Sequence, residues 1–165
     1  MRPKPIAVED ARQTLFVYRT TIPTEYEDSN GHMNVRYYMA IFDEAGYPMI
    51  EEFGLTPEYL ESRGEGGFDL EHHLNYLNEV RVGDDVSVYV RIVGFTPKRT
   101  HYLMLMVNET RGNVASTFEC INSYADLKIR KTAPYPLEVA ERIQAFLAQH
   151  QALAWDAPVC GVMSA

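Results

Sequence analysis

The segment from residue 35 to residue 53 restricts the possible folds of this chain more than any other feature. Its apolar residues recur at three- and four-residue spacing, which predicts one long helix with a broad apolar face. Asn34 can cap the start of this helix, and Gly54 followed by Pro57 can end it. Pro48 lies inside the pattern and predicts a kink near Gly46, because an interior proline removes a backbone hydrogen bond.

Alternating apolar and polar residues predict one strand before this helix and four strands after it. The predicted strands cover residues 15–22, 68–76, 85–93, 100–109 and 114–129. The fourth of them is apolar on both faces, as is typical of a central, covered strand. A short helix is predicted near residues 137–149. This order predicts an α+β fold in which an antiparallel sheet wraps around one buried helix.

The length of 165 residues matches one domain with one ordinary core. We expect an N-terminal arm without periodic structure (residues 1–13), a folded domain (14–135), and a C-terminal helix and tail (136–165). One sheet with one helix leaves sheet edges and apolar surface uncovered. We therefore expect edge pairing into a homodimer, or a homotetramer built as a dimer of dimers.

Composition excludes several classes of partner. The net charge of -8 argues against a nucleic-acid partner, because phosphate neutralisation needs clustered Lys and Arg. The sequence contains no window of about 18 apolar residues, the length needed to cross a membrane. Its first residues lack the apolar centre of a signal peptide. Only Cys120 and Cys160 are present, which predicts free thiols in a reducing cytoplasm, with Cys120 buried as a small apolar residue.

The densest polar run is DSNGHMN, from Asp28 to Asn34, between the first strand and the long helix. A helix start presents unpaired backbone N–H groups and a positive dipole end, which can stabilise a carbonyl oxygen as it becomes an oxyanion. Asp28 could then act as a general base toward water or attack a carbonyl carbon directly, and the sequence does not separate these mechanisms. The same residue types also build turns and caps without any catalytic purpose.

The run Asp28-x-Asn30-Gly31-His32-Met33-Asn34, followed by Tyr37-Tyr38 and Phe42, resembles the signature that opens the central helix of hotdog-fold acyl-CoA thioesterases. Residues 68–73 and 77–84 are similar to the second strand and the following turn of that family, in particular of its betainyl-CoA thioesterase-like branch. The resemblance covers residues 14–135. It implies a hotdog fold that hydrolyses a small or medium acyl-CoA thioester and needs no cofactor or metal.

The resemblance also implies roles for individual residues. It assigns the catalytic carboxylate to Asp28 and the oxyanion donors to backbone N–H groups from Gly31 to Asn34. Substrate and water would be oriented by Asn30, His32 and Asn34. Residues expected to contact the substrate are Tyr37, Tyr38, His73, Lys98 and Arg99. The two tyrosines could attract a quaternary ammonium group, and the basic pair could meet the phosphates of coenzyme A.

Glu71 is the rival catalytic carboxylate, because the similar branch also has glutamate there. The alternation places Glu71 and His73 on the strand face that points away from the helix, so Glu71 would act only across a subunit boundary; a surface ion pair is its alternative role. His72 and His73 are neighbours on a strand and point to opposite faces, so they cannot share a metal, and no metal site is expected. We expect His72 to be a hydrogen-bonded core histidine.

Two other functions remain open from the sequence. A hotdog dehydratase acting on a hydroxyacyl thioester would pair a histidine with an acid, as His32 beside Asp28 could. A non-catalytic module that binds acyl thioesters could share the same fold. Asp28 at the helix start favours the enzyme, since a binding module has no need of a carboxylate facing a thioester carbonyl.

Overall fold

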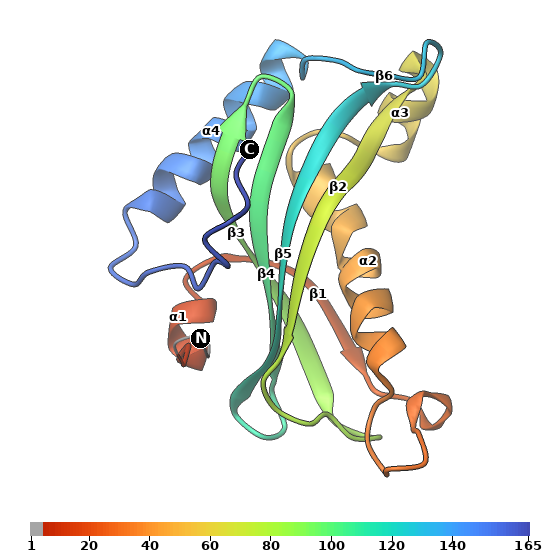
Figure 1. Cartoon of the computed structure of the whole chain (residues 1–165), viewed down its shortest axis with the longest axis vertical. Helices are drawn as coiled ribbons and strands as arrows, with labels where there is room; N and C mark the ends of the chain where they lie inside the picture. The colour runs from red at the N-terminus through yellow and green to blue at the C-terminus, as the bar shows by residue number, and fades with distance from the viewer. Residues whose placement is uncertain (1–4) are drawn as a thin grey trace. The chain divides into compact units, whose positions relative to one another are not determined.

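A computed structural model of the chain describes residues 5–165 (Figure 1). In chain order the elements are α1 (Val8–Ala11), β1 (Leu15–Thr21), the 3-10 turn η1 (Thr24–Tyr26), α2 (Val35–Glu52), α3 (Pro57–Arg63), β2 (Glu65–Tyr76), β3 (Asp85–Thr96), β4 (Arg99–Asn108), β5 (Asn113–Asp126), β6 (Lys131–Thr132) and α4 (Leu137–Gln151). The predicted order of one strand, one long helix and four strands is confirmed. Among these helices none is long and apolar enough to span a membrane.

The strands form one sheet in the order β1-β3-β4-β5-β2, with the short β6 paired to β5. β1 pairs with β3 in antiparallel register, from Leu15 opposite Val90 to Thr21 opposite Asp85. Short connections link β3 to β4 and β4 to β5, which requires antiparallel neighbours. The central strand β4 is buried at every residue after Arg99. The expected α+β class and the covered central strand are therefore confirmed.

The chain forms two compact units, and each unit combines three separate segments. Among the described residues, the first unit contains residues 5–48 together with Leu74–Val90 and Met104–Phe118. The second contains Met49–His73, Arg91–Leu103 and Glu119–Ala165. The boundary follows contacts in space, since the four strands β2, β3, β4 and β5 each contribute residues to both units.

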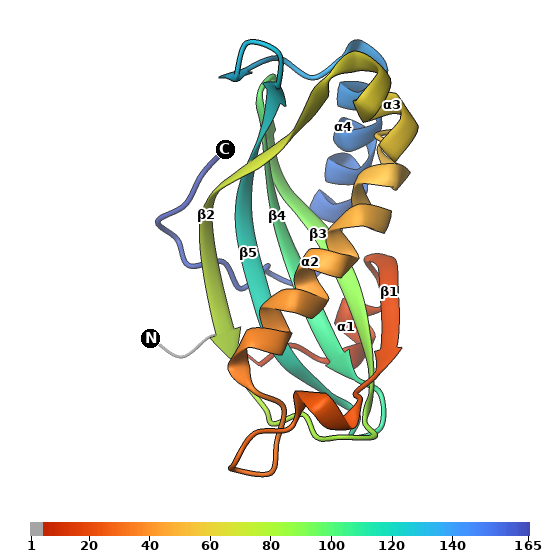
Figure 2. The same ribbon diagram turned by 90° about the vertical axis from the view of Figure 1, so that its right-hand side faces the viewer.

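Helix α2 contributes the apolar face that the sequence predicts. In the first unit Tyr38, Phe42 and Ala45 are buried, and α2 lies along the sheet (Figure 2). The Phe42 ring stacks on Phe118 of β5 at a centroid distance of 5.2 Å. Such aromatic pairs stabilise a core beyond the area they bury. This packing holds α2 on the sheet, and it thereby fixes the position of the N-terminal turn of the helix.

Both ends of α2 use the predicted caps. The Asn34 side chain accepts a hydrogen bond from the backbone N–H of Arg36 at 3.2 Å, as an N-cap does. At the other end Gly54 has a φ of +90°, and the N–H of Leu55 donates to the carbonyl of Ile50. This is a Schellman ending, for which glycine is preferred. The helix continues through Pro48 without a break; a bend near Gly46 stays a prediction.

Four elements differ from the sequence prediction. The N-terminal arm was expected to lack periodic structure, but residues 8–11 form α1, in which Val8 and Ala11 are buried. Helix α3 and the short β6 were not predicted. The last long strand was expected to reach residue 129 but ends at Asp126, after which Arg130 adopts a positive φ of 56° in a turn.

Strand β2 lies at the edge of the sheet, and residues 67–73 are all exposed. Phe68 is 66% exposed and Leu70 47%, although their face was expected to be apolar. The predicted core role of His72 is wrong, since this residue is exposed and its Nε2 lies 2.9 Å from Asp69 Oδ2. Residues three apart point to opposite faces of a regular strand, so the strict alternation fails between these two residues.

Buried polar contacts hold the C-terminal segment within the second unit. The Arg91 guanidinium of β3 donates to the carbonyls of Trp155 at 2.7 Å and His150 at 3.1 Å, and it lies 4.1 Å from the centroid of the Trp155 ring. The backbone N–H of Ile92 donates to His150 Nδ1 at 2.8 Å. Burial, followed by the positive charge of Arg91, lowers the pKa of His150 to about 4. His150 is therefore a neutral acceptor at pH 7.

Candidate active site

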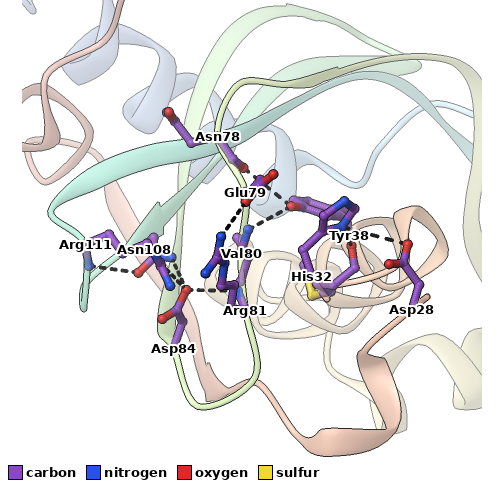
Figure 3. A network of polar contacts seen from close by, with 11 residues as sticks. Asp28, His32, Tyr38, Asn78, Glu79, Val80, Arg81, Asp84, Asn108 and Arg111 are labelled. Carbon is purple, nitrogen blue, oxygen red and sulfur yellow. Dashed lines mark hydrogen bonds and ion pairs between the residues drawn. The ribbon is translucent and has the colours of Figure 1, made fainter. Parts of the chain in front are cut away.

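The loop before α2 closes on itself and holds Asp28 in place (Figure 3). Glu27 and Met33 form an antiparallel bridge, and the N–H of Asp28 donates to the His32 carbonyl at 3.0 Å. The N–H of Gly31 donates to the Asp28 carbonyl at 3.1 Å, and its φ of +75° suits glycine because other residues are strained there. The polar run of the sequence is thus a tight turn.

The Asp28 carboxylate has two different environments. Its Oδ1 accepts the backbone N–H of Asn30 at 2.8 Å, while its Oδ2 lies 3.8 Å from His32 Nδ1. The side chains of Asp28 and His32 are 17% and 28% exposed, so both are sheltered and still reachable. The turn therefore binds one carboxylate oxygen, and the other oxygen lies beside the His32 imidazole.

Only some backbone N–H groups of this turn are free to donate a hydrogen bond to an oxyanion. Those of Gly31, Met33 and Asn34 donate to the carbonyls of Asp28, Val80 and Tyr26 respectively. Within residues 5–165 the N–H groups of His32 and Val35 donate to no protein acceptor. They flank the start of α2, where the positive end of the helix dipole adds to their effect. Of the donors predicted at Gly31, His32, Met33 and Asn34, only the His32 N–H has no protein acceptor in the described part of the chain, and the Val35 N–H lies one residue beyond that range.

A cavity of about 240 Å³ lies beside this turn. Its lining residues are His32, Met33, Val35, Tyr38, Tyr76, Leu77, Asn78 and Glu79. His32 belongs to both the cavity wall and the Asp28 contact, so it joins the carboxylate to the cavity. Glu79 adds a negative charge to the wall. No role was predicted for Glu79, although its segment (residues 77–84) belongs to the part of the sequence that resembles the family.

Tyr38 connects α2 to the cavity wall from beneath the surface. It is 4% exposed, and its hydroxyl accepts the N–H of Val80 at 3.2 Å and donates to the carbonyl of Asn78 at 3.4 Å. Burial raises the pKa of Tyr38, so the hydroxyl remains protonated. The ring also meets Tyr76 edge-on at 5.1 Å. In this arrangement the hydroxyl positions the loop that contains Glu79.

A buried carboxylate fixes the other end of the same loop (Figure 3). Asp84 Oδ2 accepts hydrogen bonds from the N–H of Arg81, Asn108 Nδ2 and Arg111 Nε, at 2.9, 2.8 and 2.7 Å. Burial alone raises the pKa of Asp84, but these hydrogen bonds outweigh burial and keep it below its usual value. Asp84 is therefore charged at neutral pH and anchors the segment that follows Glu79.

The Tyr37 ring, which was predicted to contact the substrate, packs in part against other side chains of the protein. The Tyr37 ring stacks on Tyr26 with 3.7 Å between centroids and 6° between planes, and the Arg36 guanidinium lies 4.8 Å from the Tyr37 centroid. Tyr37 is half-buried and Arg36 is exposed. The stack braces the first turn of α2 against η1, so Tyr37 helps to hold the turn that contains Asp28.

The remaining predicted site residues belong to the second unit, whereas Asp28 and its neighbours belong to the first. Glu71 is exposed on β2. Lys98 and Arg99 are exposed at the turn between β3 and β4. His73 has a side chain that is 46% exposed, with Nδ1 3.9 Å from Glu119 Oε2. The predicted site residues between 28 and 38 therefore belong to one unit, and these four residues belong to the other.

Similarity to known proteins covers most of the chain. A family model described as Thioesterase-like superfamily matches residues 22–143. Betainyl-CoA thioesterase of Pseudomonas aeruginosa is 30% identical over 141 residues, which cover 86% of this chain and 89% of that protein. The L-carnitine dehydrogenase/betainyl-CoA thioesterase of Rhizobium meliloti is 26% identical, over 90% of this chain and 29% of that longer protein.

One solved structure shows the same arrangement of helices and strands. A Staphylococcus aureus protein determined in complex with CoA superimposes with a TM-score of 0.82 at 24% identity, covering 92% of this chain and 96% of that chain. The likeness concerns the fold. Together with the family match, it confirms the hotdog arrangement expected from the motif before the long helix.

Proposed function

Since this chain belongs to the thioesterase-like superfamily, we propose that it hydrolyses an acyl-CoA thioester to a free acid and coenzyme A. The observation that supports this most is the Asp28 carboxylate, which is held by the Asn30 N–H and lies beside His32 at the cavity wall. A hydrolase needs a base or nucleophile next to a place where an acyl carbon can sit. The sheltered turn before α2 supplies both.

The proposed reaction uses the two unpaired N–H groups at the start of α2. The thioester carbonyl oxygen would point to the N–H groups of His32 and Val35, which stabilise its developing negative charge. Asp28 accepts a proton from water as the water oxygen bonds to the acyl carbon. The C–S bond then breaks, coenzyme A leaves as thiolate and takes up a proton, and the acid is released. Direct attack by Asp28 gives the same products through an anhydride that water opens.

A small cationic acyl group, such as the betainyl group, is the proposed substrate. The relative with 30% identity is named for betainyl-CoA. The cavity is small, and its lining residues include Glu79, Tyr38 and Tyr76. A quaternary ammonium is attracted both by a carboxylate and by aromatic faces. Lys98 and Arg99 stay the proposed contacts for the phosphates of coenzyme A, and both are exposed and free to reach an anion.

This proposal is tested by measuring thiol release from betainyl-CoA and from 3,3-dimethylbutyryl-CoA, in which carbon replaces the cationic nitrogen. We expect turnover of both and at least a tenfold preference in kcat/KM for the cation, about 1.4 kcal/mol of differential binding. Glu79→Gln should reduce the preference, whereas Glu51→Gln, an exposed glutamate on α2, should not. Equal kcat/KM values would refute the cationic substrate while leaving thioester hydrolysis intact.

The two competing functions give different results in the same assay. A dehydratase would release no thiol and would convert a hydroxyacyl-CoA to the unsaturated ester. A binding module would bind acyl-CoA without turnover of any ester. Either result would refute the hydrolase. A cytoplasmic location is part of the proposal, since coenzyme A esters are intracellular metabolites and both cysteines are free thiols.

A homodimer formed through the β2 edge, alone or within a dimer of dimers, is also proposed. The edge leaves backbone groups unpaired and exposes Phe68 and Leu70, the features that favour edge pairing. Leu70→Lys should raise the dimer dissociation constant at least tenfold in sedimentation equilibrium, because it places a charge at the pairing surface. Leu137→Lys changes an exposed leucine on α4 and should leave the constant unchanged. A monomeric wild-type chain at micromolar concentration would exclude the dimer.

A further inference from the structure

The second unit contains a group of metal-ligating side chains that the proposed hydrolysis does not use. His101 lies on β4, Glu119 on β5 and His73 on β2, and these strands are neighbours in the sheet. Cys160 lies in the C-terminal segment after α4. Four separate parts of the chain therefore converge on one place.

Glu119 is the centre of this group. Its side chain is 2% exposed, and a carboxylate so buried requires hydrogen-bond partners. His101 Nε2 lies 2.8 Å from its Oε1, and the backbone N–H of Cys160 donates to its Oε2 at 2.6 Å. His73 Nδ1 lies 3.9 Å from the same Oε2. One carboxylate oxygen thus faces a buried histidine, and the other faces the two more exposed residues.

We propose that His73, Glu119 and Cys160 bind a divalent transition metal, Zn²⁺ by preference. Their ligand atoms all lie within 4.8 Å of one another. A tetrahedral zinc with bonds of about 2.0–2.3 Å places its ligand atoms about 3.3–3.6 Å apart, so the three atoms need to approach by roughly 1 Å. An imidazole, a carboxylate and a thiolate are the donors that zinc takes most often in proteins.

The exposure of the ligands suits this approach of about 1 Å. His73 is 46% exposed and Cys160 is half-buried, so both side chains have room to turn toward the ion. A carboxylate oxygen has two lone pairs, so Glu119 Oε2 can keep the Cys160 N–H and still bind a metal. His101 acts as a positioning residue, since its contact with Oε1 orients the carboxylate. Water completes the fourth position on the exposed side.

A second group within residues 5–165 also offers three ligand types, namely Asp69, His72 and Cys120. Its cysteine is fully buried on β5, and burial raises the pKa of the Cys120 thiol, which opposes formation of the thiolate. Asp69 is already engaged by Asn122 Nδ2 at 2.6 Å and by His72. The group that contains Cys160 is therefore the better site, and the other one supplies a matched control.

Cobalt titration of the chelator-treated full chain tests the proposal. Co²⁺ should bind with one equivalent and give a thiolate-to-metal charge-transfer band that Zn²⁺ abolishes by displacement. Cys160→Ser should remove the band and Cys120→Ser should retain it. His101→Gln should weaken binding by about 10–100-fold, as loss of a residue that orients a ligand does.

Protein stability gives a second readout. Zn²⁺ should raise the Tm of the wild type and of Cys120→Ser, but not that of Cys160→Ser, because the ion links the C-terminal segment to β2 and β5. Far-ultraviolet circular dichroism and thiol release should be the same for all variants without metal. No band in the wild type, a band that survives in Cys160→Ser, or a band lost in Cys120→Ser would each overturn the site.

Discussion

Replacement of Asp28 by asparagine should lower kcat for thioester hydrolysis by about 10³-fold and leave the fold intact. Asparagine has the same shape, so its Oδ1 can still accept the N–H of Asn30 and keep the turn closed. The substitution removes the oxygen that lies 3.8 Å from His32 Nδ1 as a base or nucleophile. Thiol release under substrate saturation measures the effect, and circular dichroism verifies the fold.

Two variants make this result specific. Asp43→Asn causes the same chemical change at an exposed position on α2, the helix that follows the Asp28 loop, and should retain wild-type kcat. Glu71→Gln tests the rival carboxylate on β2. A full loss of thiol release in Glu71→Gln, together with an active Asp28→Asn, would move the catalytic carboxylate to β2. Full activity in both variants would mean that neither residue is the base.

Acidification should destabilise the protein through His150 well before most carboxylates titrate. The folded protein holds this residue neutral with a pKa of about 4, against 6.5 for an ordinary histidine. Between about pH 6.5 and pH 4, His150 is therefore protonated in the unfolded chain and neutral in the folded chain. The stabilisation is complete above pH 6.5 and is lost as the pH falls toward 4. Since each pKa unit corresponds to about 1.4 kcal/mol, the loss is about 2 kcal/mol by pH 5 and roughly 3 kcal/mol by pH 4.

Urea unfolding at pH 7.5 and pH 5.0 measures this effect when wild type is compared with His150→Asn. Asparagine can still accept the N–H of Ile92 but does not titrate, so its free energy of unfolding should change by about 2 kcal/mol less between the two pH values. His150→Ala leaves that buried N–H unpaired and should be less stable by about 1–3 kcal/mol at pH 7.5. An equal pH dependence in wild type and His150→Asn would show that another group titrates.

Elements with a long, uninterrupted pattern were predictable from the sequence. The spacing of Tyr38, Phe42 and Ala45 predicted α2, and alternation predicted the strands that became β3 and β4. Helix α3 was missed because Gly54 and Pro57 were assigned only to the end of α2. In the structure Thr56 caps α3, Pro57 is its first residue and Gly64 ends it with a φ of +66°. These signals were present, but seven residues are too few to show a helical period.

Features that depend on distant parts of the chain were not predictable. The break in alternation between Asp69 and His72 reflects the local path of an edge strand, and a period of two contains no sign of it. Glu79 lines the cavity because the Tyr38 hydroxyl holds its loop, a contact across about forty positions of sequence. The proposed metal site also depends on residues that are distant in the sequence. His72 and His73 cannot share an ion, but folding brings His73 close to Glu119 and Cys160.

The distribution of charge along the β2 edge has a consequence for the newly synthesised protein. Asp69 and Glu71 alternate with the exposed Phe68 and Leu70 in one stretch of open backbone. Apolar side chains on a free edge attract any extended chain, and interspersed charges discourage neutral strands from joining. In the proposed homodimer, these charges would guard a protomer against aggregation before it meets its partner. The two acidic side chains would thus act as gatekeepers between folding and the proposed assembly.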